Sequence, residues 1–160
     1  MWIKILAFFI AFGSMEMVAH LAHKYVMHGF LWILHKSHHK KMHGFWEKND
    51  IYFLVFAAPG VLLIANGVQN KFDWNFYAGI GIATYGFVYL LVHDIIIHQR
   101  VKLFKGLEYP YIKALRKAHK AHHANATKDA AVSYGMLWVD RKYFETTQIP
   151  QTMRGQNIIF

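Results

Sequence analysis

The sequence predicts an all-α integral membrane helical bundle, with three to four transmembrane helices and a cytoplasmic cap of helices rich in histidine. Two observations support this prediction. Three long apolar runs occur in a chain whose residues are 55% apolar, and most of the 12 histidines lie in the segments that follow the first and third of those runs. A length of 160 residues fits one domain, so we expect residues 1–160 to form a single membrane-embedded unit.

Three segments have the length and composition of membrane spans. A helix needs about 20 predominantly apolar residues to cross a bilayer, and the segments at about 2–21, 51–68 and 76–97 meet this requirement. We expect the polar segments 20–50 and 93–138 to form the histidine-rich cap. A four-span bundle, with a hairpin hidden in one apolar run, remains open as an alternative, although it requires shorter helices.

The basic residues predict the orientation of the bundle. Lys4 and Lys71 fall on one side of the predicted spans, and the remaining sixteen of the 18 Lys and Arg residues fall on the other. The positive-inside rule places the more basic side in the cytoplasm. Two crossings separate the N-terminal histidines from the C-terminal ones, so both groups should face the cytoplasm. Membrane orientation already explains the basic excess, and we expect no nucleic-acid partner.

Ten of the histidines fall into four spaced groups. Two groups read His-x-x-His-His and two read His-x-x-x-x-His: His35, His38 and His39; His119, His122 and His123; His23 and His28; His93 and His98. On a helix, residues three and four apart share a face, so each triplet offers three imidazoles on one side. Crowded imidazoles repel when protonated, whereas a metal binds their neutral form. The spacing therefore predicts a metal site that leaves out His20 and His43.

The two pairs that are five residues apart raise a geometric question. On a regular helix such residues differ by about 140° around the axis, too much to meet at one ion. The pairs converge only if the helix ends or bulges there; otherwise their members face two different ions. Both pairs lie where a predicted span ends, so the spacing alone leaves both arrangements open.

The composition limits the kind of metal site. The chain has no cysteine, which excludes thiolate zinc sites and an iron–sulfur cluster of its own. It also lacks the Glu-x-x-His motif of carboxylate-bridged di-iron bundles. Ten imidazoles suit two transition-metal ions better than one, and open positions would remain for water or O₂. Such a site beside an apolar bilayer indicates chemistry on a lipid-soluble substrate.

The histidine groups, with their flanking residues, resemble those of the membrane fatty-acid hydroxylase and sterol desaturase superfamily. The fuller strings are similar to those of the bacterial β-carotene hydroxylases, and the similarity covers roughly residues 16–138. The strings that carry it are 23–29, 35–39, 93–100 and 118–124, together with 49–52 and 132–135. The histidine groups alone would not separate carotenoid hydroxylases from enzymes acting on sterols or fatty acids, but the surrounding residues favour the former.

The resemblance implies a non-haem di-iron mono-oxygenase of a bacterial inner membrane. Such an enzyme uses O₂ to hydroxylate C3 of the β-ionone ring, converting β-carotene through β-cryptoxanthin to zeaxanthin. The ten grouped histidines would ligate two iron ions, for which zinc can substitute in a purified sample, and no haem is expected. Electrons would come from a ferredoxin and its reductase. Arg116, Lys117 and Lys120 offer a basic face that either docks this donor or contacts lipid headgroups. Asp94 and Glu16 are expected to accept imidazole N–H groups of ligands.

Two other functions remain open from the sequence. The first is a fatty-acid or sterol hydroxylase or desaturase with the same metal ligands. The second, from a different class, is a membrane metal transporter. A transporter is expected to carry polar ligands along the middle of its spans, whereas these histidines gather toward one end and the second span, 51–68, contains none.

Overall fold

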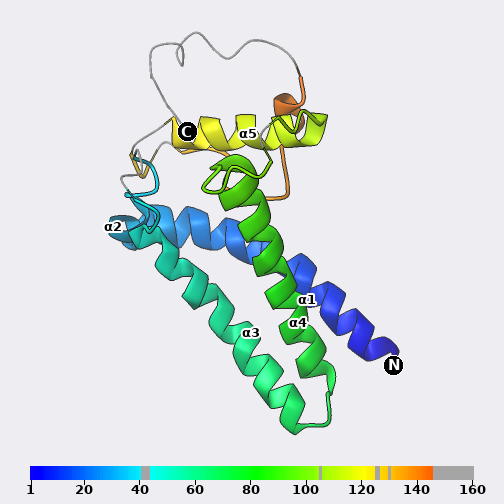
Figure 1. The fold of residues 1–160 in the computed structure, drawn as a ribbon. Coiled ribbons are helices and arrows are strands. Elements are labelled where there is room, and N and C mark those ends of the chain that lie inside the picture. The colour runs from blue at the N-terminus through cyan, green and yellow to red at the C-terminus, as the bar shows by residue number, and fades with distance from the viewer. Residues whose placement is uncertain (41–43, 105, 125–126, 130, 146–160) are drawn as a thin grey trace.

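The computed structural model describes the whole chain except residues 41–43, 105, 125–126, 130 and 146–160. The described part is helical and contains no strand. Its elements are α1 (Trp2–Leu21), η1 (Ala22–Phe30), α2 (Trp32–His35), η2 (Lys48–Asp50), α3 (Ile51–Gln69), α4 (Trp74–Tyr89), η3 (Leu90–Ile97), α5 (Pro110–His123) and η4 (Arg141–Tyr143). In Figure 1, α3 and α4 form a long hairpin, α1 runs beside α4, and α5 lies across one end of the bundle.

Three helices in the described part are long and apolar enough to cross a membrane, which confirms an integral membrane helical bundle. Two of the predicted spans agree closely with the structure, since 51–68 corresponds to α3 and 76–97 to α4 with η3. The first, 2–21, corresponds to α1, and beyond it the chain continues as the π-helix η1 to Phe30, in which His23 and His28 are buried while Lys24 is exposed.

Helix α4 is central to the bundle and packs against both α1 and α3. Two glycines allow these close approaches. A Cβ atom on Gly79 would lie 2.7 Å from the backbone oxygen of Gly60 in α3, and one on Gly81 would lie 2.5 Å from the backbone oxygen of Phe8 in α1. By contrast, a Cβ atom on Gly86 would meet no neighbour within 4 Å among the described residues.

Large apolar side chains cover the outside of the spans. Phe9 and Ile10 of α1 and Phe53 and Leu62 of α3 are each at least 57% exposed. A soluble domain rarely exposes so much apolar surface, whereas the hydrocarbon of a bilayer solvates it. Apolar side chains thus face lipid, and the buried interior at the end of the bundle holds nine histidines beside a small apolar cluster.

Helix α5 begins at Pro110. Proline is favoured at the first helical position, because the N–H that it lacks would have no partner within the helix. Its buried face carries Leu115, which packs against Ile97 of η3 and against Met136 of the segment that follows α5. The first histidine triplet was expected to lie on a helix too, but α2 ends at His35 and the residues after it form turns.

Two of the α4 glycines give a matched test of packing in the bundle. We expect Gly81→Ala to destabilise the protein by about 1–3 kcal/mol, because the added methyl group must push α1 away from α4. Gly86→Ala should be neutral or stabilising by up to about 1 kcal/mol, since alanine favours the helix and meets open space. Thermal unfolding of the two variants in detergent measures the difference, and equal midpoints would contradict the proposed contact.

Candidate metal centre

The structure brings all ten grouped histidines together at the end of the bundle beneath α5. Nine of them are buried, each exposing 9% or less of its surface, and His122 is fully buried. Nine of the ten form two clusters, within each of which the potential ligand atoms lie within 4.8 Å of one another. The five-histidine cluster contains His23, His28, His35, His39 and His122, and the four-histidine cluster contains His38, His93, His98 and His119.

The tenth histidine, His123, lies against both clusters. Its ring centroid is 4.4 Å from that of His119 and 4.5 Å from that of His39. Its Nε2 atom is buried and has no hydrogen-bond partner among the described residues. By contrast, His20 stands outside both clusters, with its ring 6.0 Å from that of Tyr134. His43 lies outside the described residues.

Local π-helical turns bring together the histidines that are five residues apart. His23 and His28 lie in η1, while His93 lies in η3 and His98 directly follows it. The backbone N–H of His98 donates to the carbonyl of His93, five residues earlier, at 2.9 Å. This wider turn brings residues five apart toward one face, and π-turns are frequent at functional sites. Both members of each pair therefore enter the same cluster, which answers the question left open by their spacing.

The two triplets, in contrast, are divided between the clusters. His35 and His39 enter the five-histidine cluster, while His38, between them, enters the four-histidine cluster. In α5, His122 belongs to the first and His119 to the second. Each triplet therefore links the two clusters and holds them side by side.

Oxygen atoms surround the five-histidine cluster on the outside. In four of its imidazoles the Nδ1 atom lies within hydrogen-bond distance of an oxygen that does not carry a proton. The acceptors are the carbonyls of Tyr134 (3.1 Å from His23), Lys128 (3.1 Å from His28) and Val132 (2.9 Å from His122), and the amide oxygen of Asn49 (2.6 Å from His35). An oxygen acceptor requires the proton on Nδ1, so the lone pair of Nε2 points inward.

The four-histidine cluster has carboxylates on its outside. A carboxylate oxygen of Glu47 lies 3.2 Å from Nδ1 of His38, and one of Asp94 lies 3.2 Å from Nδ1 of His93. Arg100 forms ion pairs with Asp94 at 3.0 Å and with Glu47 at 3.5 Å. Asp94 thus lies against the imidazole of His93, where an acceptor was expected, and also pairs with Arg100.

Glu47 was not apparent as a site residue from the sequence, and Asn49 and Arg100 stood out only as parts of resembling strings. Spacing gave no signal for Glu47 and Arg100, since neither belongs to a histidine group. The expectation for Glu16 was wrong: its carboxylate accepts backbone N–H groups of residues 136–138 and the hydroxyl of Tyr85, instead of an imidazole N–H. A carboxylate inside an apolar span satisfies these donors without reaching the clusters.

The electrostatics of the site favour neutral imidazoles. Burial lowers the pKa of His35 to about 3 and that of His122 to about 2, with neighbouring imidazoles contributing in the same direction. Burial likewise holds the pKa values of His38 and His119 well below their usual range. Burial raises the pKa of Glu47, against the opposing charge of Arg100. Metal ions bind imidazole in its neutral form, so this protonation state suits ligation.

Opposed Nε2 atoms show that the site fits a cation. Nε2 of His23 lies 3.0 Å from Nε2 of His35, and Nε2 of His28 lies 3.2 Å from Nε2 of His122. In all four of these rings the proton is held on Nδ1 by an oxygen acceptor, so two lone pairs face each other in each pair. His38 and His93 repeat the arrangement at 3.1 Å. Lone pairs at this distance repel, and a metal ion between them converts the repulsion into ligation.

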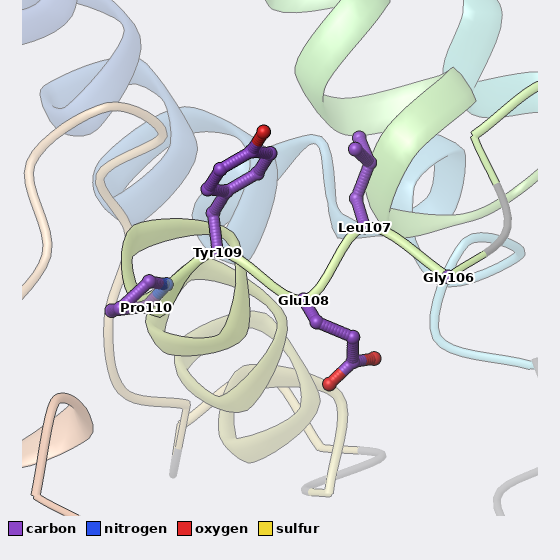
Figure 2. A pocket seen from close by; sticks show the side chains of 5 residues that line it. All are labelled: Gly106, Leu107, Glu108, Tyr109 and Pro110. Carbon is purple, nitrogen blue, oxygen red and sulfur yellow. The ribbon is translucent and has the colours of Figure 1, made fainter.

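A separate hollow on the surface takes no part in this site. It is lined by residues 106–110, which lead into α5 (Figure 2), and includes none of the histidines. Glu108 points away from the hollow's other side chains in this view and pairs with Lys113 at 2.6 Å. The contact is exposed and supports only the start of the helix.

Comparison with known proteins supports the same interpretation as the geometry. A β-carotene hydroxylase of Pantoea ananas is 41% identical over 139 residues, which cover 86% of this chain and 79% of that protein. The chain belongs to the β-carotene hydroxylase family. Another β-carotene hydroxylase, from Pseudescherichia vulneris, is 38% identical over 125 residues, covering 78% of this chain and 70% of that protein.

The family extends to plants. The chloroplastic β-carotene 3-hydroxylase 1 of Arabidopsis thaliana is 37% identical over 127 residues, covering 78% of this chain and 40% of the plant protein. No family model matches the chain, and no solved structure matches it significantly. The two bacterial β-carotene hydroxylases match this chain over most of their own length, whereas the plant protein matches it over less than half.

The contact between Glu47 and His38 gives a test of the outer residues in this β-carotene hydroxylase family member. We expect Glu47→Leu to weaken binding of one of two metal ions by about 10–100-fold, because residues that orient a ligand have effects of this size. Iron(II) titration of the purified protein under anaerobic conditions measures the loss. Glu108→Leu is the matched control, since its carboxylate is 67% exposed. Unchanged affinity in Glu47→Leu would contradict this role.

Proposed function

We propose that the chain is an oxygen-dependent carotenoid 3-hydroxylase, which converts β-carotene through β-cryptoxanthin to zeaxanthin. The observation that carries the proposal is the pair of histidine clusters with opposed Nε2 atoms, found in a member of the β-carotene hydroxylase family. The reaction inserts one atom of O₂ into a C–H bond at C3. The other oxygen atom takes up two protons and two electrons and leaves as water.

The ten grouped histidines are the proposed metal ligands, as predicted from their spacing. The five-histidine cluster would hold one ion and the four-histidine cluster the other, with His123 available at their boundary. We propose two non-haem iron ions, which supply the activation of O₂ when they are bound. Zinc also favours imidazole and can replace iron in a purified sample.

The protein's own part in the reaction is to hold and shield the imidazoles. The acceptors around the clusters fix six of the rings with Nε2 toward the interior, and burial beneath α5 keeps bulk water away. Trp32 of α2 packs against the five-histidine cluster, with its ring 5.0 Å from that of His28 and 5.1 Å from that of His39. A carotenoid dissolves in the bilayer, so its terminal ring would approach from the apolar surface of the spans.

The proposed orientation places the clusters at the cytoplasmic face of a bacterial inner membrane. The basic residues support it, because Lys4 and Lys71 lie toward one side of the spans and the other basic residues follow the positive-inside rule on the opposite side. We also retain the proposal that residues 1–160 form one domain. Among the described residues, α4 contacts both α1 and α3, and α5 contacts η3, which continues α4.

The proposed electron source is an external ferredoxin-type donor with its reductase, since the sequence has no cysteine to ligate an iron–sulfur cluster. Helix α5 is the proposed docking element, because its buried face carries three of the histidines while Lys113 and Lys117 are exposed. Arg116 is excluded from this role. Its guanidinium donates to the backbone oxygens of Ile96 and Leu107 and ties α5 to the bundle.

The other two functions receive less support. A fatty-acid or sterol enzyme would use the same ligands, but the relatives found are named for β-carotene. A metal transporter requires ligands along its spans, whereas the described clusters lie together at one end.

Expression in a bacterial host that accumulates β-carotene tests the proposal. We expect zeaxanthin in the pigment extract, with β-cryptoxanthin as the intermediate, and loss of both products in His122→Ala because a fully buried member of the cluster is removed. Gly86→Ala is the control and should remain active, since an added methyl group there meets open space. Unchanged β-carotene in cells that contain well-expressed wild-type protein would refute the function.

Charge reversal on α5 tests the proposed donor site. We expect Lys117→Glu to raise the KM for a ferredoxin several-fold, because a rim charge mainly affects encounter with a charged partner. Turnover driven by a small chemical reductant should not change. Lys71→Glu, on the turn between α3 and α4 at the opposite end of the hairpin, is the control. An equal KM for all three proteins would contradict docking at α5.

A further inference from the structure

Glu16 lies inside the first span and binds a segment more than a hundred residues away. One of its carboxylate oxygens accepts three successive backbone N–H groups, from Met136 at 2.8 Å, Leu137 at 2.9 Å and Trp138 at 3.0 Å. The other oxygen accepts the hydroxyl of Tyr85 in α4 at 2.7 Å. The carboxylate thus joins α1, α4 and the C-terminal part of the described chain.

The bound segment, residues 132–138, is here called the strap. Its carbonyls at Val132 and Tyr134 accept Nδ1–H of His122 and of His23, both members of the five-histidine cluster. The ring of Tyr134 also packs on this cluster, 5.3 Å from His28 and 5.4 Å from His122. The strap therefore connects Glu16 with these imidazoles indirectly.

The path of the strap depends on an acceptor at this point. Three N–H groups converging on one oxygen need a charged acceptor, because charge-assisted hydrogen bonds are about twice as strong as neutral ones. The strap also passes close to the carboxylate, since a Cβ atom on Gly135 would lie 3.2 Å from the Glu16 oxygen and 3.0 Å from the backbone oxygen of Trp138. Without the carboxylate, the partly buried N–H groups of Met136 and Leu137 would lose their acceptor, so the strap would have to move.

The four-histidine cluster does not depend on the strap in this way. The outer contacts described for it come from Glu47 and Asp94, which Arg100 links. These residues lie on η2, η3 and their flanking turns. A disturbance that begins at Glu16 should therefore reach one cluster and spare the other.

We propose that Glu16 is a positioning residue for the five-histidine cluster, acting through the strap to orient His23 and His122 toward their metal ion. The proposal rests on the metal site of the proposed function and leaves the carotenoid substrate aside. Its consequence is that loss of the carboxylate weakens one metal ion selectively.

Metal binding by three variants tests this role. We expect anaerobic iron(II) titration of the wild type to give two ions per chain, and Glu16→Leu to bind one of the two about 10–100-fold more weakly. Glu16→Gln keeps an oxygen acceptor and should fall between them. Tyr85→Phe is the matched control, because it removes one hydrogen bond to Glu16 and leaves the three strap bonds in place. It should bind both ions like the wild type.

The outcomes separate positioning from a general structural role. A folded Glu16→Leu that binds two ions with wild-type affinity would overturn the proposal, as would an equal weakening of both ions. If Glu16→Leu does not fold, Glu16→Gln decides by the same criterion. The titration contains no carotenoid and is therefore independent of the pigment assay. If Glu16→Leu shows the selective loss but the wild type forms no zeaxanthin, the role of Glu16 stands and only the proposed substrate is refuted.

Discussion

The opposed lone pairs of buried neutral imidazoles are the constraint on which the rest of the structure depends. His23 faces His35 with their Nε2 atoms 3.0 Å apart, and His28 faces His122 with their Nε2 atoms 3.2 Å apart. Each of these four rings directs its Nδ1 proton outward to an oxygen. The facing Nε2 lone pairs therefore repel each other unless both bind the same cation. Such a centre is stable only if the surrounding chain holds the rings in place before the ion binds, and most of the polar contacts at this end of the bundle serve that purpose.

The two halves of the centre meet this constraint with different chemistry. Backbone carbonyls and an amide surround the five-histidine cluster, whereas two carboxylates tied by Arg100 border the four-histidine cluster. A carboxylate makes its imidazole a stronger donor than a carbonyl does, and it brings negative charge toward the metal. The two ions would therefore experience different electrostatic surroundings even though their ligands are of one kind.

The membrane bundle supplies the rigid frame for this arrangement. Apolar side chains on α1 and α3 face outward, where lipid contact stabilises the spans, and a small apolar cluster around Leu115 supports the cap. The close approaches at Gly79 and Gly81 fix α4 against both neighbours, and the π-turns of η1 and η3 extend these helices into the site. The candidate metal centre is thus built partly on continuations of transmembrane helices, which are stiffer than loops. Helix α5, α2 with the turns after it, and the strap complete it.

The sequence by itself determined the apolar spans, the start of α5 at Pro110 and which ten histidines are candidate metal ligands. Length, apolar runs and residue spacing are local properties of the chain. It left open whether His23 and His28 converge, since a π-turn has no distinct spacing signal. Only the tertiary structure decided how the triplets divide between clusters and which groups hold the rings. The contacts of Tyr134 with His23 and of Glu16 with Leu137 join residues 111 and 121 positions apart. Hydrogen bonds of that range depend on how the helices pack, and no local pattern in the chain records them.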